Sequence, residues 1–182
     1  MMDRLKEALI DLKLGKVIAF PSEGVWGLGC DPNNEVAVAK LLRLKQRSMN
    51  KGLILVGGTL EHMKPYIEVE KYKTKLLTKW PGPHTWVVPT VSAPKWITGE
   101  NFSVALRVSS HPVISLLCEK FGGAIVSSSA NLQGKTPAKS RKEVEKFFKG
   151  INVVGGNIGV LQGPTPIQEI ETNNWIRKPS LL

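Results

Sequence analysis

Short, continuously apolar segments, each leading into a polar turn, constrain the fold of this chain more than any other feature of its sequence. The clearest are residues 17–20 (Val-Ile-Ala-Phe), 53–56 (Leu-Ile-Leu-Val) and 124–126 (Ala-Ile-Val). A run this short, without polar alternation, is typical of a strand that is covered on both faces. Amphipathic helical patterns separate the runs, so the sequence predicts a sheet with helices packed against it.

The segments between these runs have the start and stop signals of helices and further strands. Asp3 and Gly15 are placed to cap and to end a first helix, and Asn33 or Asn34 is placed to cap a second. Ser140-Arg-Lys-Glu143 has the pattern of a capping box that begins a late helix. We also expect helices over residues 69–80 and 111–121, and strands over 84–88, 103–108, 167–171 and 174–177.

The order of these elements indicates one α/β domain over residues 1–182. A chain of 182 residues fits a single domain and is long enough to bury a substantial core. Short strands alternate with helices without strict βαβ regularity. This pattern favours a twisted mixed sheet with flanking helices.

Three cations lie in the short polar link between the second helix and the strand at 53–56. They are Lys45, Arg47 and Lys51. On composition alone such a run is a solvated basic turn. The buried elements on both sides hold its backbone in place, however, and that is what an anion site requires.

Hydroxyl and amide groups follow the apolar run at 124–126. The segment directly after it contains Ser127, Ser128, Ser129 and Asn131. Such polar side chains pack poorly in a core and are well suited to bind a ligand. A third polar segment, residues 20–29, leaves the first strand through a Pro/Gly-rich turn. Both segments are candidates for a binding site.

Composition is that of a soluble globular protein, with 42% hydrophobic and 22% charged residues. No apolar run approaches the ~20 residues of a membrane span, and the charged N-terminus lacks the apolar stretch of a signal peptide. We therefore expect a cytoplasmic protein with no membrane partner. Cys30 and Cys118 lack a Cys-x-x-Cys spacing, which favours reduced, structural thiols. The net charge of +10 favours a nucleotide or RNA as partner.

Several kinds of chemistry lack their sequence signatures. There is no Gly-x-x-x-x-Gly-Lys-Ser/Thr segment and no complete Gly-x-Gly-x-x-Gly, so side chains must hold any bound ATP. His62, His84 and His111 have no metal-ligand spacing, which predicts no metal held by the protein. No Gly-x-Ser-x-Gly elbow surrounds the serines, so we expect no covalent nucleophile. Cations, hydroxyls and amides remain, and they suit nucleotidyl transfer, in which positioning and charge neutralisation dominate.

Seven short motifs, in their order along the chain, are similar to those of a known family. They are Pro21-Ser-Glu, Lys45-Gln-Arg47, Lys51-Gly-Leu-Ile-Leu55, Trp80-Pro-Gly-Pro-His-Thr85, Ala105-Leu-Arg-Val108, His111-Pro112 and Ser129-Ala-Asn-Leu-Gln-Gly134. Together they resemble the YrdC-type family, and within it the bacterial threonylcarbamoyl-AMP synthases, and the resemblance extends over most of the chain. The resemblance implies a curved sheet whose concave side forms a basic substrate cavity.

The activity implied by the resemblance is nucleotidyl transfer. A carbamate formed from L-threonine and bicarbonate or CO2 attacks the α-phosphate of ATP, giving threonylcarbamoyl-AMP and pyrophosphate. Mg²⁺ would be carried by the ATP, and no prosthetic group is implied. Downstream threonylcarbamoyl transferase proteins would use the product to modify the tRNA adenosine next to the anticodon. Weak binding of tRNA or double-stranded RNA to this chain fits the same picture.

The resemblance also assigns site residues. ATP-binding residues would be Lys45, Arg47, Lys51, Ser129, Asn131 and Arg177. Threonine-binding residues would be Ser22, Arg107, Ser127 and Thr165. Without the resemblance, an exposed strand residue is an alternative for Arg107, an ordinary turn residue for Thr165, and a packing turn for the Trp80–Thr85 motif.

The chain departs from the family pattern at three positions. The family's Pro-Thr-Glu is Pro-Ser-Glu here, which keeps a hydroxyl at Ser22. The next position, often Thr, is Gly24, so a side-chain contact there is lost. Pro166 follows Thr165 where the family has Pro-Ser-x-Ile, which leaves the local backbone open.

Two rival functions fit parts of the pattern. A non-catalytic module that binds double-stranded RNA or ribosomal RNA would explain the charge, but such binding needs a broad cationic face rather than a small polar pocket. A hydrolase or carbamoyltransferase could use the same cavity without releasing pyrophosphate. Arg107 and the hydroxyl clusters favour the synthase.

Overall fold

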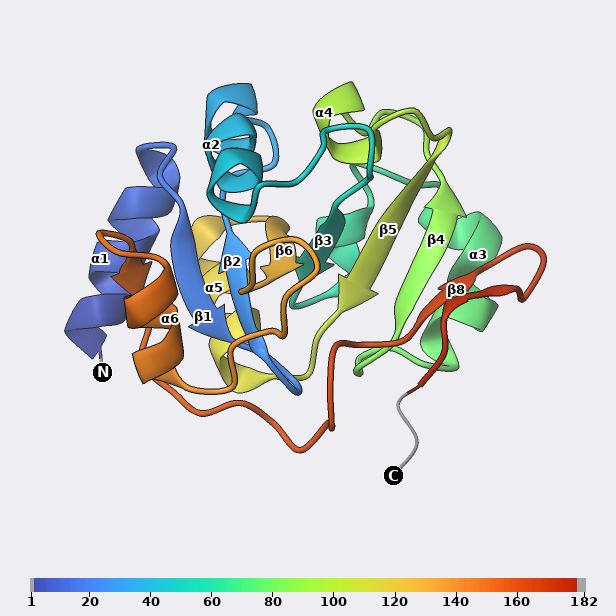
Figure 1. Cartoon of the computed structure of the whole chain (residues 1–182). Coiled ribbons are helices and arrows are strands. Elements are labelled where there is room, and N and C mark those ends of the chain that lie inside the picture. Colours follow the sequence, from blue (N-terminus) through green and yellow to red (C-terminus); the bar gives the residue numbers. More distant parts are fainter. Residues whose placement is uncertain (1, 180–182) are drawn as a thin grey trace.

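The computed structural model describes residues 2–179, in which the strands form one nine-stranded sheet of order β7-β1-β2-β6-β3-β5-β4-β8-β9 (Figure 1). The strands are β1 Ile18–Pro21, β2 Trp26–Gly29, β3 Ile54–Gly57, β4 Thr85–Pro89, β5 Ser103–Val108, β6 Ile125–Ser129, β7 Asn152–Val153, β8 Ile167–Glu169 and β9 Trp175–Arg177. Three neighbouring pairs, β1/β7, β3/β5 and β4/β8, are parallel, and the others are antiparallel. The predicted α/β fold with a mixed sheet is confirmed.

Helices precede and separate the strands, most of them near the predicted positions. They are α1 Met2–Lys13, α2 Glu35–Lys45, α3 Val69–Leu77, α4 Lys95–Thr98, α5 Pro112–Phe121 and α6 Arg141–Phe147, with a 3₁₀ turn η1 at Leu60–Met63. The Asn34 side chain accepts from the Ala37 backbone N–H at 3.0 Å, and the capping box of Ser140 and Glu143 is formed as predicted. Asp3 lies in the first turn of α1 rather than at its cap. None of the helices within residues 2–179 is both long and apolar enough to span a membrane.

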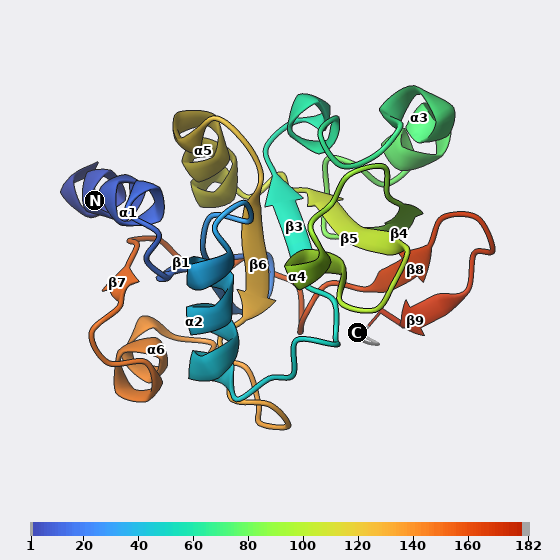
Figure 2. The same cartoon turned by 90° about the horizontal axis from the view of Figure 1, so that it is seen from above.

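Helices cover both faces of the strands around β1. Ile18 and Phe20 pack in a cluster with apolar residues of α1 and α5, whereas Ala19 belongs to the larger cluster on the opposite face. Figure 2 shows α1 and α5 on one side of these strands and α2 and α6 on the other. Because successive side chains of a strand point to opposite faces, β1 is apolar throughout, as its sequence predicted.

Strand β2 was not predicted, because its glycines look like turn residues in the sequence. Gly27 and Gly29 make room for a neighbouring ring instead. A Cβ at Gly29 would lie 2.3 Å from the Val126 carbonyl oxygen and 2.6 Å from the ring of Phe20. The segment 26–29 is therefore a strand whose small residues permit close packing.

Several other predicted details differ from the structure. Helix α4 was missed because it has only four residues. Ser127–Ser129 lie within β6 rather than after it, because their backbones pair with β2 and β3. Helix α5 buries Ile114, Leu117 and Cys118, while Leu116 is exposed. Apolar residues on more than one side of α5 made its buried face ambiguous in the sequence.

The two cysteines are buried and free. Cys30 belongs to the larger core cluster and Cys118 to the cluster formed with α1 and α5. Burial raises the pKa of each thiol to about 12, which suppresses the reactive thiolate. The prediction of structural thiols is confirmed.

Candidate active site

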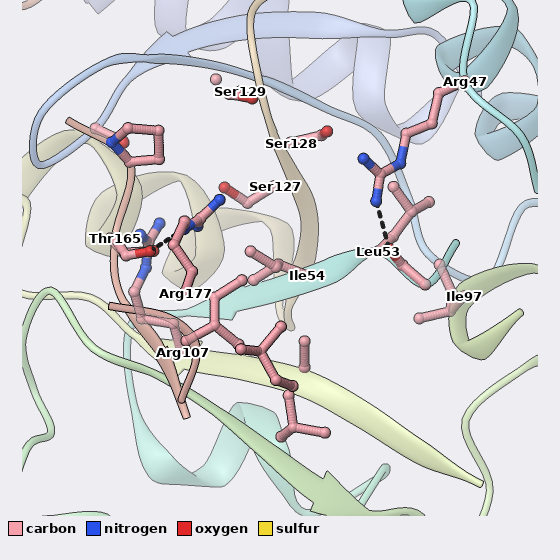
Figure 3. A pocket seen from close by; sticks show the side chains of 18 of the residues that line it. Arg47, Leu53, Ile54, Ile97, Arg107, Ser127, Ser128, Ser129, Thr165 and Arg177 are labelled. Atoms are coloured by element: carbon pink, nitrogen blue, oxygen red, sulfur yellow. Dashed lines mark hydrogen bonds between the residues drawn. The ribbon is translucent and has the colours of Figure 1, made fainter. Parts of the chain in front are cut away.

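A cavity of about 370 Å³ lies where β5 and β6 meet the C-terminal segment (Figure 3). Its lining comes from parts of the chain that are far apart in the sequence. The lining residues used below come from the β1–β2 turn, the link before β3, helix α4, strands β3, β5 and β6, and residues 164–177. The sheet therefore assembles the site from many segments, most of them short.

Alternate residues of β5 form the floor of the cavity. Ser103, Ala105 and Arg107 of β5 all line it, whereas the residues between them are buried in the core. Ile54 of β3 is paired with Ala105 on one side and with Ser127 of β6 on the other. Paired residues of adjacent strands share a face, so these three strands present one surface to a ligand.

Arg107 is held in place by a buried carboxylate. Its side chain is 4% exposed, and Nη1 lies 3.1 Å from Oε2 of Glu23. Oε1 of Glu23 accepts a hydrogen bond from Ser109 Oγ at 2.6 Å. The alternative that Arg107 is an exposed strand residue is therefore wrong, and the guanidinium lies in the cavity wall.

Arg177 and Thr165 lie close to Arg107 in Figure 3. Nε of Arg177 donates to the Thr165 carbonyl oxygen at 2.7 Å, and the Thr165 hydroxyl lies 3.0 Å from that of Thr85. Burial lowers the pKa of Arg177 to about 10, with smaller contributions from Arg107 and Arg47. Two guanidinium groups thus lie at one end of the cavity, next to Ser127.

Arg47 occupies another part of the cavity. Its Nη2 donates to the Gly52 carbonyl oxygen at 2.9 Å, and burial lowers its pKa. Leu53, Ile54 and Ile97 form an apolar wall beside it (Figure 3). A cation next to an apolar wall suits a ligand with both a charged and a flat apolar part.

Most of the sequence-predicted site residues line this one cavity. They are Ser22, Arg47, Arg107, Ser127, Ser129, Thr165 and Arg177. Lys45, Lys51 and Asn131 do not line it. For all of them, the binding role itself stays a prediction.

Lys45 and Asn131 lie behind the lining and hold the end of β6. The Lys45 ammonium is buried and donates to the carbonyl oxygens of Ser129 and Asn131. The Asn131 side chain accepts from Ser129 Oγ at 2.6 Å and donates to the Leu132 and Lys135 carbonyl oxygens at 2.8 Å each. Burial, and then the charge of Arg47, lower the pKa of Lys45 to about 8. Both side chains thus stabilise the end of β6, which carries Ser129, and the turn that follows it, a role that sequence reasoning had not assigned to them.

Lys51 is exposed, and its backbone forms an isolated bridge with Gly99. It lies on the link before β3 and outside the lining, although Arg47 and Gly52 of the same link line the cavity. The alternative of a solvated basic residue, which the sequence left open, fits this placement.

Sequence reasoning assigned no role to Glu23 or Thr85. Each lies in a motif that was recognised, Pro21-Ser-Glu and Trp80–Thr85, and each is buried. The available signal for Glu23 in the sequence was a carboxylate inside a stretch rich in apolar residues and glycine, residues 17–30. The structure buries this whole stretch, and a buried carboxylate needs a partner.

The cavity has an excess of positive charge. Arg107 is paired with Glu23, but among residues 2–179 neither Arg47 nor Arg177 forms an ion pair with a carboxylate. One further carboxylate, Glu169, lies in the lining. In the same part of the chain, no three His, Cys, Asp or Glu side chains gather as a metal-binding group. The arrangement therefore suits an anionic ligand.

Comparison with known proteins gives related sequences along almost the whole chain. The family model Sua5/yciO/yrdC, described as "Telomere recombination", matches residues 11–175. The threonylcarbamoyl-AMP synthase of Xanthomonas campestris pv. campestris is 42% identical over 180 residues, covering 95% of this chain and 96% of that protein. The protein of the same name from Xanthomonas oryzae pv. oryzae is 41% identical over the same length.

Solved structures share the fold. A variant of P. abyssi Sua5 superposes with a TM-score of 0.90 at 27% identity, covering 97% of this chain and 56% of that one. P. abyssi Sua5 complexed with L-threonine gives a TM-score of 0.84 at 28% identity, covering 91% of this chain and 50% of that one. This chain thus spans about half the length of P. abyssi Sua5. E. coli YciO, at 22% identity and a TM-score of 0.85, has the same fold.

Proposed function

The chain belongs to the Sua5/YciO/YrdC family, and from this premise we propose that it is a threonylcarbamoyl-AMP synthase. It is a nucleotidyltransferase that makes threonylcarbamoyl-AMP and pyrophosphate from L-threonine, bicarbonate or CO2, and ATP. The observation that carries the proposal is the cavity in which Arg47, Arg107 and Arg177 come together with Ser127 and Thr165. Relatives with this name match the chain over nearly all of its length.

The reaction needs no side-chain nucleophile. The threonine amine takes up CO2 to form a carbamate, and a carbamate oxygen then attacks the α-phosphorus of ATP. The bond from that phosphorus to the bridging oxygen breaks, and pyrophosphate leaves with the electron pair. The protein must position two anionic reactants, neutralise their charge and keep water from a labile product. The buried arginines and hydroxyls provide the first two of these.

We place threonine at the end of the cavity that contains Arg107. A guanidinium pairs with a carboxylate through two parallel hydrogen bonds. Ser22, Ser127 and Thr165 are all nearly buried lining residues that offer hydroxyls. They are suited to contact the amino and hydroxyl groups of threonine.

We place the nucleotide between Arg47, Ser129 and Arg177. The two arginines without a carboxylate partner within residues 2–179 would bind phosphate oxygens, and the wall of Leu53, Ile54 and Ile97 suits the adenine ring. Mg²⁺ would be carried by the phosphates. In this arrangement Lys45 and Asn131 act by holding Ser129, and Lys51 remains a candidate only for phosphates that extend out of the cavity.

The product is a mixed anhydride and hydrolyses readily in water. We therefore propose that it passes in the cytoplasm to transferase proteins that place the threonylcarbamoyl group on tRNA. Any contact of this chain with tRNA would be weak and would serve delivery rather than recognition.

Pyrophosphate release tests this function. The protein is incubated with ATP, Mg²⁺, bicarbonate and each amino acid in turn, and pyrophosphate is measured. We expect release only when threonine and bicarbonate are both present, because only the carbamate attacks ATP. Equal release when either is omitted would contradict the proposal and would favour a simple ATP hydrolase.

A further inference from the structure

Glu23 is a buried carboxylate beside the cavity. It lies in the turn between β1 and β2 and is 7% exposed. Carboxylates are seldom this buried without a charged partner, and Glu23 has one in Arg107, at 3.1 Å. Glu23 does not line the cavity, so it faces the arginine from behind rather than the ligand.

The contact with Glu23 uses only one side of the guanidinium. It is an ion pair between Nη1 and Oε2 of Glu23 at 3.1 Å, without hydrogen-bond geometry, and both Oε2 and Nε of Arg107 are buried with no hydrogen-bond partner within residues 2–179. Nε and Nη2 form the edge of an arginine that pairs with a carboxylate through two parallel hydrogen bonds. A buried Nε–H without a hydrogen-bond acceptor costs free energy, unless a bound ligand supplies the acceptor.

We infer that Glu23 is a positioning residue, which binds one side of Arg107 and leaves the Nε edge for the carboxylate of the amino-acid substrate. This inference rests on the proposed function, because it names how threonine is recognised. Arg107 contacts the substrate, and Glu23 acts only through Arg107.

Glu23 is itself fixed at both ends. Its Oε1 accepts from Ser109 Oγ at 2.6 Å, and Ser109 Oγ in turn accepts from the His111 backbone N–H at 3.0 Å, at the start of α5. Its backbone carbonyl accepts from the Leu161 N–H at 2.9 Å. A carboxylate held in this way has little freedom to follow a moving arginine, so it sets the orientation of the guanidinium.

The pairing also divides the positive charge of the cavity. Glu23 neutralises Arg107 before any substrate arrives, so Arg107 selects its ligand by hydrogen-bond direction more than by net charge. Arg47 and Arg177 keep their full charge for the phosphates. Glu23 thereby distinguishes Arg107, for the amino acid, from the unpaired Arg177 that lies beside it at the same end of the cavity.

Glu23→Gln tests the inference through the carboxylate of the ligand. Binding of L-threonine and of L-threoninamide, which lacks the carboxylate, is measured by titration calorimetry on the wild type and the variant. We expect threonine binding to weaken by roughly 10- to 150-fold, as for a lost charge-assisted contact, with threoninamide and ATP binding unchanged. The KM for threonine should rise in parallel, with little change in the KM for ATP.

Ser109 provides a second, matched test in case Glu23→Gln does not fold, which melting curves would reveal. Ser109→Ala removes the hydroxyl that holds Glu23. It should weaken the binding of threonine by a smaller factor than Glu23→Gln does, and it should leave the binding of threoninamide unchanged. Ser109→Thr keeps the hydroxyl and should bind threonine as the wild type does.

Two results would overturn the positioning role. One is wild-type threonine affinity in both Glu23→Gln and Ser109→Ala. The other is an equal loss for threonine and threoninamide, which indicates a purely structural ion pair. Failure of the proposed function looks different, because the wild type would then bind threonine in a Glu23-dependent way and yet release no pyrophosphate.

Discussion

Single residues in this cavity divide the work between the two reactants. Arg107 and Arg47 are both arginines in the lining, but Arg107 is paired with Glu23, whereas Arg47 donates to a backbone carbonyl and lies beside a largely apolar wall. Recognition of short motifs in the sequence was enough to name both. The motifs could not show that the two arginines have different environments, because the partner of Arg107, Glu23, lies 84 positions away in the chain.

Arg107→Lys should raise the KM for threonine by roughly 10- to 150-fold, because one ammonium cannot reproduce two parallel hydrogen bonds to a carboxylate while also binding Glu23. The KM for ATP should change much less. Arg47→Ala is the matched variant and should affect ATP far more than threonine. Steady-state kinetics with each substrate varied in turn measures both effects. If each variant changes the two KM values equally, the cavity has no separate amino-acid and nucleotide ends.

At the scale of elements, Lys45 connects the end of α2 to the end of β6. Lys45→Met should lower the free energy of unfolding by about 1–3 kcal/mol, because the partly buried carbonyl oxygens of Ser129 and Asn131 each lose a charged donor. For a chain of this size that corresponds to roughly 2–12 °C in melting temperature. Turnover should fall as well, since Ser129 is then held less firmly.

Lys51→Met is the control for this prediction, because Lys51 is exposed. Its stability should stay within about 0.5 kcal/mol of the wild type. Thermal melting followed by circular dichroism measures both variants. Equal melting temperatures for the two would mean that the buried ammonium does not hold the turn, and Lys45 would return to the role of a phosphate ligand.

The elements show which parts of the fold the sequence could predict. Apolar runs and capping residues correctly predicted β1, β3, α2 and α6, because those signals are local in the sequence. Strand β2 was missed because the packing of Phe20 against Gly27 and Gly29 depends on tertiary contacts. For the same reason the serines of β6 were expected after the strand, although their backbones complete its pairing.

At the scale of the whole molecule, the sheet decides which distant segments meet. Residues 164–177 return beside β4 and bring Thr165 and Arg177 to Arg107, as Figure 1 shows for β8. Strand order is a property of nonlocal pairing, so the local patterns of this sequence did not specify it. The resemblance to a family predicted a basic cavity. The side-chain contacts in the structure indicate which of its arginines suits threonine and which suit the nucleotide.

Net charge is likewise a property of the whole molecule, and it bears on tRNA. The chain carries +10, and much of the charge lies on exposed lysines outside the cavity, such as Lys71, Lys73 and Lys79 in and just after α3. A dispersed cationic surface binds phosphates without reading bases. We expect weak tRNA binding that falls steeply with salt, because each phosphate contact releases a counterion. Substrate and non-substrate tRNAs should bind alike.

Fluorescence titrations across a salt series measure this binding, with a non-substrate tRNA as the matched control. The logarithm of the binding constant should fall linearly with the logarithm of salt concentration, with a slope of about −0.7 to −0.9 for each phosphate contacted. Reversing the charge of Lys71 and Lys73 together should reduce the slope while leaving pyrophosphate release unchanged, since neither residue lines the cavity. Tight, salt-resistant binding that selects substrate tRNAs would contradict this view, because such binding requires contacts to bases rather than to phosphates alone.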